Sequence, residues 1–432
     1  MNIILLSGGS GTRLWPLSNN VRSKQFLKFF DGKDGKISMI QRMYRMIKET
    51  DPSSVITVAT SQNQVPQIKL QLGEDVNICV EPCRKDTFPA IVLACSYLIE
   101  NGVSEDDSVV ICPVDPFVEK SYFSCLKELS NMAKDNDKNL YLMGINPTYP
   151  SEKYGYIFIE NGIVTGFKEK PTEDLARKYI EEGALWNSGV FAFKIKYILD
   201  IALKTYGFND YKLIYQNYDK LEKISFDYAV AEKEKEIGVI RFNGEWKDLG
   251  TWNTITEAMT DKCIGNIVCD KCNNTHIINE LSIPLISLGI NNAVIVATYD
   301  GILVSDKNNS SYLKDYVKLR RPMYEKREWG EYKVLDYNEL ENQSSLTKHL
   351  IIEEGKGISY QLHHLRTEIW TIVDGEGKLI LDGQSSIVSR GTTVVIKPGT
   401  KHAIFAKKEL QIIEVQLGEE LSEDDIERFE LI

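Results

Sequence analysis

The first 115 residues alternate between short apolar runs and segments with helical character, and this alternation limits the possible folds more than any other feature. The apolar runs are 2–6, 54–60, 76–82 and 107–115, and the segments between them are 38–49, 62–72 and 88–100. Within 38–49, Met39, Met43, Met46 and Ile47 share one helical face. Alternation of this kind predicts an α/β fold with a mostly parallel sheet covered by helices on both faces.

Polar turns directly follow three of the predicted strands. They are a glycine-rich turn after Leu6, a Glu-Pro turn at Glu81 and a Pro-Val-Asp turn ending in Asp115. In an open parallel sheet, ligands bind beyond the carboxyl ends of the strands. Because all three turns fall at that edge, the sequence predicts an active site there.

The glycine-rich turn reads "SGGSGTR" and lies close to the start of the chain. Glycines after a strand allow backbone N–H groups to approach a phosphate. A P-loop is excluded because no Lys-Ser or Lys-Thr follows the glycines, and Leu14 stands where the dinucleotide fingerprint needs a third small residue. For this stretch taken alone, a tight turn without a ligand remains the alternative.

Charge and cysteine content exclude other classes of protein. The 432 residues carry a formal net charge of −11, which argues against a nucleic-acid partner. Cys269-x-x-Cys272 has no second pair at zinc-finger spacing, so we expect buried reduced thiols rather than zinc or a disulfide scaffold. The sequence shows neither a signal-peptide pattern nor an unbroken apolar run of membrane-spanning length. We therefore expect a cytoplasmic protein without a membrane partner.

The character of the chain changes after about residue 260. From Cys263 to Val304, short apolar runs separated by Asn, Gly and Asp predict stacked, β-helix-like strands. Residues 307–322 predict a helix and linker, and short strands with glycine-containing turns after about Lys326 predict a small all-β barrel. We expect three parts, 1–260, 261–325 and 326–432.

Eight motifs occur in a fixed order along the chain. They are "LLSGGSGTRLWPLS" with "KQFL", "EPCRKDTFPA", "CPVDP", "YGYI", "FKEKP", "WNSGVF", "FDYAVAEK" and "WKDLGTW". Together they resemble the sugar-1-phosphate nucleotidyltransferases, in particular the mannose-1-phosphate guanylyltransferases. The C-terminal part resembles the cupin of their longer, bifunctional members, so the resemblance covers essentially the whole chain. It implies a Rossmann-like nucleotidyltransferase domain followed by a cupin.

The resemblance also implies a reaction, the Mg²⁺-dependent transfer of GMP from GTP to α-D-mannose 1-phosphate with release of pyrophosphate. The attacking sugar phosphate is already an anion at neutral pH, so such an enzyme must position polyanions and neutralise charge. The residues carried over by the resemblance are Arg13 and Lys24 for catalysis; Leu6, Gly8, Gly9, Gly11, Thr12, Glu81 and Arg84 for the nucleotide; Asp115 and Asp248 for Mg²⁺; and Gly155, Glu169, Lys170, Asn187, Ser188 and Asp227 for the sugar phosphate.

Three positions depart from the pattern of the family. Ser23 replaces a proline, Phe88 an alanine and Pro116 a histidine. None of these removes a charged catalytic group, so the reaction type is expected to hold. Another acceptor such as a heptose or fucose 1-phosphate, another base, or a non-catalytic regulator that binds nucleotide sugars remain alternatives.

The C-terminal barrel has its own candidate site. Gln361, His363, Glu368 and His402 resemble ligands of a divalent metal ion in a cupin. Leu365 and Ile369 stand where the family has histidines, and the sequence ends without the family's Tyr-Gly-Arg. We expect a vestigial or structural barrel without mannose-6-phosphate isomerase activity; a bifunctional enzyme is the alternative. Because related transferases use the β-rich segment for subunit contact, we also expect a homodimer.

Overall fold

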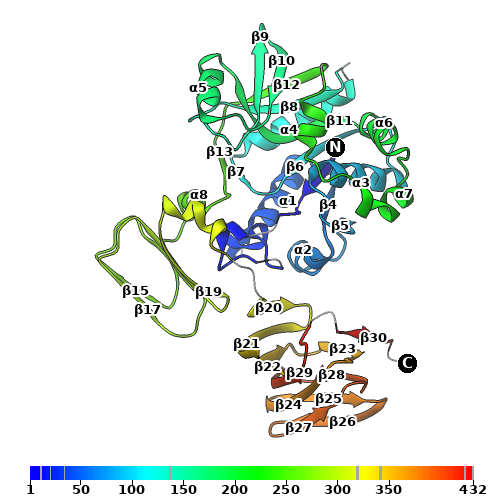
Figure 1. Ribbon diagram of the computed structural model, residues 1–432, viewed down its shortest axis with the longest axis vertical. Coiled ribbons are helices and arrows are strands. Elements are labelled where there is room, and N and C mark those ends of the chain that lie inside the picture. Colours follow the sequence, from blue (N-terminus) through cyan, green and yellow to red (C-terminus); the bar gives the residue numbers. More distant parts are fainter. Residues whose placement is uncertain are drawn as a thin grey trace. The chain divides into compact units, whose positions relative to one another are not determined.

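The computed structural model describes residues 1–9, 12–19, 21–33, 35–135, 138–317, 321–339, 343–422 and 425–430. The chain divides into two compact units (Figure 1). The first unit consists of Met1–Leu14, Arg22–Lys262 and Lys307–Asp315, and the second of Trp15–Val21, Cys263–Asp306 and Tyr316–Ile432. The division into three parts stays a prediction, since the second unit contains both the β-rich segment and the barrel.

A nine-stranded sheet forms the centre of the first unit, with β10-β9-β11-β6-β1-β4-β5 in order and β8 pairing with both β11 and β12. The strands are β1 (Asn2–Leu6), β4 (Val55–Ser61), β5 (Asn77–Glu81), β6 (Ser108–Pro113), β8 (Leu140–Ile145), β9 (Tyr156–Glu160), β10 (Ile163–Lys168), β11 (Leu185–Lys194) and β12 (Ile237–Phe242). Strands β6, β1, β4 and β5 are parallel, whereas β11 runs antiparallel to β6, β8 and β9. The predicted α/β fold is confirmed, and the parallel strands are those that end at the predicted active site.

Helices pack on both faces of this sheet (Figure 1). They are α1 (Met39–Thr50), α2 (Val65–Leu72), α3 (Thr87–Glu100), α4 (Ser121–Asp135), α5 (Glu173–Glu181), α6 (Ile195–Tyr206) and α7 (Tyr211–Gln216). A further helix, α8 (Trp252–Ala258), lies away from the sheet. Side chains of β1 alternate between the faces, so that Ile4 packs in the core with α3, and Ile3 and Leu5 in the core with α1 and α4. Helix α1 starts where predicted because Ser38 caps it, accepting a hydrogen bond from the Gln41 N–H.

The first unit also contains several short elements. They are the hairpin β2 (Lys28–Gly32) and β3 (Gly35–Ser38), the pair β7 (Pro116–Val118) and β13 (Trp246–Asp248), the 3₁₀ turns η1 (Thr12–Leu14), η2 (Lys24–Phe26), η3 (Gln62–Gln64), η4 (Tyr218–Lys220) and η6 (Asn309–Asp315), and the π-helical turn η5 (Asp227–Ala231). Turn η6 lies where a helix was predicted; residues 318–320 of the predicted linker lie outside the described residues.

The β-rich segment of the second unit forms short parallel rungs. Strands β14 (Cys263–Gly265), β16 (His276–Asn279) and β18 (Ala293–Thr298) pair in parallel, β19 (Gly301–Asp306) pairs antiparallel to β18, and β15 (Ile267–Asp270) pairs in parallel with β17 (Leu285–Leu288). The predicted β-helix-like form is confirmed. Its outer side chains include exposed Ile286, Leu288, Ile302 and Val304. The homodimer that we expect through this segment stays a prediction.

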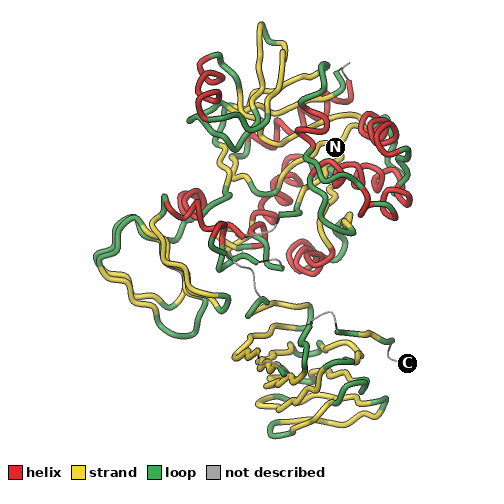
Figure 2. The backbone as a smooth tube through the Cα atoms, viewed as in Figure 1, coloured by secondary structure: helices red, strands yellow, loops and turns green. Residues whose placement is uncertain are grey.

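The C-terminal part of the second unit is a barrel-like pair of antiparallel sheets, drawn as strands and loops in Figure 2. One sheet contains β20 (Tyr324–Arg327), β21 (Gly330–Glu339), β22 (Ser344–Ile352), β29 (Leu410–Gly418), β24 (Arg366–Asp374) and β27 (Thr393–Ile396) in that order. The other contains β26 (Gln384–Ser389), β25 (Glu376–Leu381), β28 (His402–Ala406), β23 (Gly357–Leu362) and β30 (Glu427–Arg428). Leu346, Trp370, Ile404 and Ile412 are buried between them. The predicted all-β barrel is confirmed.

In the described part of the chain, no helix has the length and apolar character that a membrane span requires.

Candidate active site

Four of the predicted charged residues converge at the carboxyl edge of the first sheet. Asp115 follows β6, and Asp248 ends β13, where it pairs with Pro116 of β7. Lys24 opens η2, and its Nζ lies 2.5 Å from Asp115 Oδ2. Arg13 and Asp248 both lie next to Gly250. A Cβ added at Gly250 would be 3.3 Å from Arg13 Nη1 and 3.1 Å from Asp248 Oδ1. The structure therefore brings together two cations and two carboxylates.

The electrostatics of this cluster distinguish its two acids. Burial acts to raise the pKa of Asp115, but the Lys24 ammonium outweighs it and holds that pKa below its ordinary value. Burial raises the pKa of Asp248 and the charge of Asp115 adds to that effect, while Lys24 and Arg13 act to lower it. For Lys24, burial acts to lower the pKa, but Asp115 and Asp248 raise it above its ordinary value. Asp115 and Asp248 are neighbouring carboxylates, and the negative charge of Asp248 is only partly balanced by the nearby cations. Such a pair fits a hard divalent cation such as Mg²⁺.

The glycine-rich turn is held from behind by buried polar side chains. Gln25 Nε2 donates to the Ser7 carbonyl oxygen at 3.0 Å, and Ser23 Oγ donates to the Gly9 carbonyl oxygen at 3.0 Å. Gln64 Nε2 reaches the same Gly9 oxygen at 3.3 Å and donates to Ser23 Oγ at 2.8 Å. In a trans peptide the N–H points opposite to the C=O. Fastening the Ser7 carbonyl to the interior therefore turns the Gly8 N–H, which belongs to the same peptide, outward.

The three residues of this clamp were not predicted as functional. They are Ser23, Gln25 and Gln64, and each is at most 2% exposed. The available signals were the serine in place of the family's proline and the glutamine of "KQFL". Of the predicted turn residues, Gly8 and Gly9 are exposed, Leu6 and Thr12 are half-buried, and Gly11 lies outside the described residues.

Replacing Ser23 with alanine tests the clamp. We expect kcat/KM for the nucleotide to fall about tenfold, because one buried hydrogen bond to Gly9 is lost and Gln64 loses a partner. The KM for the sugar phosphate should stay unchanged, and Ser23→Thr should restore activity. Steady-state kinetics measure the split, with Ser104→Ala, an exposed position before β6 at the opposite sheet edge, as the control. Equal losses in both KM values would contradict a role in the turn.

Glu81 adjoins the glycine-rich turn on the side of β5. A Cβ added at Gly8 would lie 3.4 Å from Glu81 Oε1. Tyr218, a residue that the sequence did not single out, donates to Glu81 Oε2 at 2.8 Å, and burial raises the pKa of this carboxyl. Arg84 is exposed, and its charge acts on Glu81. The two predicted residues thus lie together next to the turn.

The residues predicted for the sugar phosphate form a second cluster. Lys170 forms an ion pair with Glu169, whose carboxyl is buried. A Cβ added at Gly155 would come within 2.5 Å of Glu169 Oε2, which explains the glycine at this position. Asn187 donates from its backbone N–H to the Gly155 oxygen at 2.8 Å and from Nδ2 to Asp227 Oδ1 at 2.8 Å. Five of the six predicted residues are therefore linked.

Ser188 is the exception in this second cluster. Its hydroxyl donates to the Met143 carbonyl oxygen at 2.9 Å, and the side chain is buried in the sheet. The structure therefore joins Ser188 to β8 rather than to Glu169 and Lys170. Tyr228 was missed by the sequence reasoning; the Lys170 ammonium lies 5.8 Å from the centre of its ring.

Asp227 is expected to make the stability of the protein depend on pH. Burial, followed by the charge of Glu169, raises the pKa of Asp227 from 3.8 to about 7. The folded state therefore binds a proton more tightly than the unfolded state, and the stability so gained is lost as pH rises towards the folded-state pKa. We expect the Tm of Asp227→Asn to increase relative to that of the unsubstituted protein as the pH is raised from about 5 to about 8. A Tm difference that is constant over this range, measured by thermal denaturation, would contradict the assignment.

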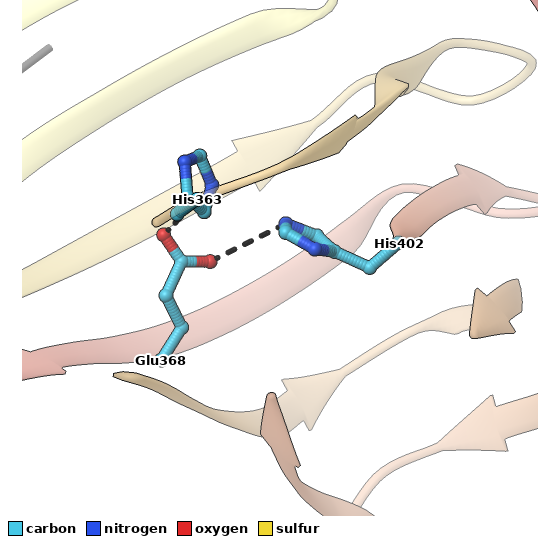
Figure 3. Close-up of side chains that lie close together, drawn as sticks. All are labelled: His363, Glu368 and His402. Atoms are coloured by element: carbon cyan, nitrogen blue, oxygen red, sulfur yellow. Dashed lines mark ion pairs between the residues drawn. The ribbon is translucent and has the colours of Figure 1, made fainter. Parts of the chain in front are cut away.

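In the barrel, three predicted metal ligands meet: His363, Glu368 and His402, with ligand atoms within 4.8 Å of one another (Figure 3). His363 Nδ1 lies 2.5 Å from the Asp425 carbonyl oxygen and His402 Nδ1 lies 2.9 Å from that of Thr400. A carbonyl only accepts, so both Nδ1 atoms carry the proton. Burial lowers the pKa of His363, which favours its neutral form. The Nε2 atoms of His363 and His402 face Glu368 at 3.2 and 3.6 Å.

The chemistry of these donors fits a divalent ion such as zinc. His402 is 0% exposed, and its Nε2 has no hydrogen-bond partner among the described residues. Gln361 Nε2 lies 3.4 Å from His363 Nε2. Arg366, which the sequence reasoning missed, also enters the cluster, donating from Nε to Glu368 Oε1 at 2.8 Å and lying with Nη2 3.1 Å from His363 Nε2.

One argument for a vestigial barrel is wrong in this structure. Leu365 is 53% exposed, and Ile369 lies on the opposite face of β24 from buried Glu368 and Trp370. A histidine at either position would point away from His363 and His402. The loss of those histidines therefore removes no ligand from this cluster. The absence of isomerase activity stays a prediction.

Comparisons with known proteins agree with this architecture. Residues 2–263 match the family model described as nucleotidyl transferase, and residues 314–431 match the one described as mannose-6-phosphate isomerase C-terminal. The chain is 30% identical to the mannose-1-phosphate guanylyltransferase RfbM of Salmonella typhimurium, over 99% of this chain and 96% of that protein. It is also 30% identical to the xanthan biosynthesis protein XanB of Xanthomonas campestris, over 99% and 97%.

A solved structure supports the fold independently. The crystal structure described as mannose-1-phosphate geranyltransferase from Thermus thermophilus superposes with a TM-score of 0.61 at 23% identity. The similarity covers 73% of this chain and 97% of that one. At this identity the match establishes a shared fold.

Proposed function

This chain belongs to the nucleotidyl transferase family, and we propose that it transfers GMP from GTP to α-D-mannose 1-phosphate, releasing GDP-mannose and pyrophosphate. The observation that carries the proposal is the convergence of Arg13, Lys24, Asp115 and Asp248 beside the glycine-rich turn. The choice of mannose and guanine is supported by the name of the RfbM relative.

The chain's own residues position and neutralise the reacting phosphates. N–H groups of the glycine-rich turn donate to phosphate oxygens, aimed by the clamp behind Ser7 and Gly9. The Arg13 guanidinium binds oxygens bidentately, and the Lys24 ammonium neutralises charge at the α-phosphate. The attacking oxygen is already ionised at neutral pH, so these residues hold it in line rather than remove a proton from it.

Asp115 and Asp248 would hold Mg²⁺, which supplies charge neutralisation to the triphosphate when bound. Lys24 keeps Asp115 ionised, because its ammonium lowers the pKa of that carboxyl against the effect of burial. Asp115 in turn fixes the position of the Lys24 side chain. Each residue of the pair therefore maintains the charge and place of the other.

The second cluster provides the acceptor site. Lys170 is placed to bind the sugar phosphate, and the buried carboxyl of Glu169 accepts hydrogen bonds from sugar hydroxyls. Gly155, Asn187 and Asp227 maintain the shape of this site through their hydrogen bonds and close packing. Glu81, next to the glycine-rich turn, and Arg84, whose charge acts on it, would contact the nucleotide base.

A substrate panel tests the proposal. The purified full-length protein is supplied with Mg²⁺, each of the four nucleoside triphosphates and several sugar 1-phosphates, including those of mannose, glucose, fucose and a heptose. We expect the fastest pyrophosphate release with GTP and mannose 1-phosphate. Faster release with another pair would move the proposal to that acceptor or base. No release with any combination would overturn the enzymatic function and leave a nucleotide-sugar-binding regulator.

The same preparation decides what the barrel does. We propose that it binds a divalent ion through His363, Glu368 and His402 without isomerising sugar phosphates. Fructose 6-phosphate is supplied with zinc, cobalt, manganese or magnesium, and mannose 6-phosphate is measured. Turnover near the median enzyme rate of about 10 s⁻¹ would make the chain bifunctional.

A further inference from the structure

Three cysteines of the β-rich segment depart from the expected buried, inert thiols. Cys263 and Cys269 are exposed, and Cys272 is half-buried. The expectation holds for the buried thiols of the first unit, which are Cys79, Cys95 and Cys112. The motif Cys269-x-x-Cys272 has no part in the proposed transferase reaction, so its geometry needs a separate explanation.

Both cysteines of the motif lie against Ser287. Cys269 pairs with Ser287 in the parallel ladder of β15 and β17. Cys272 Sγ lies 3.5 Å from the Ser287 hydroxyl oxygen and 3.5 Å from its carbonyl oxygen. Between the cysteines, Lys271 adopts a left-handed conformation with φ 53°, which bends the chain after β15. The motif therefore folds its two thiols towards one serine.

The two thiols differ in their affinity for a proton. A hydrogen bond from Ser287 lowers the pKa of Cys272, and the backbone N–H groups of Ile290 and Gly289 add to this effect. Hydrogen bonding with Cys272 raises the pKa of Cys269 to about 11. Cys263 also interacts with Cys269. At neutral pH, Cys272 is thus the better nucleophile, and Cys269 keeps its proton.

We propose that Cys272 is a reactive thiol that exchanges with small disulfides, and that Cys269 resolves the resulting adduct by closing a Cys269–Cys272 disulfide. The site is independent of the proposed transferase function, because all of its groups lie within the β-rich segment. Its substrate class is the low-molecular-weight disulfide.

The exchange balances in two steps. The Cys272 thiolate attacks one sulfur of a disulfide R–S–S–R, which breaks the S–S bond and releases one thiolate that takes a proton from water. Cys269 then loses its proton to solvent and attacks the Cys272 sulfur of the mixed disulfide, expelling the second thiolate. Two protein thiols are oxidised to one disulfide, and R–S–S–R is reduced to two thiols.

The first step prepares the second. The main cause of the raised pKa of Cys269 is its hydrogen bonding with Cys272. Once the Cys272 sulfur is bound in a mixed disulfide, it carries no thiolate, and this cause disappears. The pKa of Cys269 then falls towards its ordinary value, so that more of this thiol is ionised when it must attack.

The position of the pair also leaves it accessible. Val268 and Cys269 are consecutive in β15 and point to opposite faces of the strand. Val268 lies beside Ile286 on the apolar face, and Cys269 lies beside Ser287 on the other. Cys269 is exposed and Cys272 is half-buried, although Ser287 beside them is buried.

The test treats the reduced, full-length protein with glutathione disulfide near neutral pH and follows it by intact-protein and peptide mass spectrometry. We expect a transient adduct at Cys272 and then an internal Cys269–Cys272 disulfide. Cys272 should be modified at least about tenfold faster than Cys125, a half-buried thiol whose pKa is raised by burial. Excess thiol should restore the reduced form.

Four variants separate the roles. Cys269→Ser should accumulate the mixed disulfide at Cys272, Cys272→Ser should abolish fast modification, and Cys83→Ser in the first unit should behave like the unsubstituted protein. Ser287→Ala should slow the first step without blocking it. Modification of Cys125 as fast as that of Cys272, a Cys263–Cys269 disulfide as the main product, or a disulfide between two chains would each overturn the proposal.

Discussion

Replacing Lys24 with methionine is expected to lower kcat/KM for pyrophosphate release by about a thousandfold, a loss in the range measured when a pre-organised donor is removed from a transition-state site. Methionine keeps most of the length of the side chain but removes the ammonium that lies 2.5 Å from Asp115 Oδ2. Two effects combine, since the charge at the phosphate disappears and Asp115 loses the interaction that lowers its pKa.

The control for Lys24→Met is Lys28→Met, an exposed lysine four positions further along in β2. It should retain full activity and the same Tm. Lys24→Arg should restore part of the rate, because the charge returns with a different shape. Measurement combines steady-state kinetics with thermal denaturation of all three variants.

This substitution also distinguishes an enzyme from a regulator that only binds nucleotide sugars. A regulator would show a weaker Kd for the nucleotide and no catalytic rate to lose. A loss in kcat with nearly unchanged nucleotide affinity supports catalysis. Full activity of Lys24→Met would show that its ion pair with Asp115 is structural.

The positions of the main site follow from features that are local in the sequence. The apolar run of β1 ends at Leu6, and that of β6 ends just before Asp115, so the edge at which the polar turns meet could be predicted. Parallel pairing of β1 with β4 and β6 then brings these ends together.

Contacts between distant segments could not be predicted in the same way. Ser23 and Gln64 are 41 positions apart, and their hydrogen bond exists only because η2 and η3 come together behind the glycine-rich turn. Ser23 is marked only by replacing the family's proline, and Gln64 has no charge or spacing that marks it. Burial of their polar atoms is the signal, and burial depends on the tertiary fold.

Side-chain direction explains the other differences. Ile369 follows Glu368 in the sequence, but β24 alternates its faces, so that Arg366, Glu368, Trp370 and Ile372 point inward and Ile369 does not. Leu365 precedes the strand and is exposed. The motif alone does not show which of two neighbouring positions faces the barrel interior. The exposed thiols of Cys263 and Cys269 have a similar origin, since the edge strands of the β-rich segment bury little of their surface.

The second large effect is expected from Asp248→Asn, which should lower kcat by about a hundredfold or more and raise the Mg²⁺ concentration needed for half-maximal rate. Asparagine keeps the shape and one carbonyl oxygen of Asp248 but removes the charge. Asp115 would then be the remaining carboxylate of the pair, and its charge is already balanced in part by Lys24.

The pH profile gives an independent measure of the same residue. Burial and the nearby charge of Asp115 raise the pKa of Asp248, so in the unsubstituted protein the ionised form is gained only as pH rises through this raised value. Activity limited by Asp248 should therefore increase with pH, and Asp248→Asn should lose that rise. Asp106→Asn, an exposed carboxyl before β6, serves as the matched control and should keep both the rate and the profile. If Asp248→Asn instead keeps the same Mg²⁺ dependence and pH profile at a reduced rate, the carboxylate acts through the packing of β13 against β7 rather than by binding the ion.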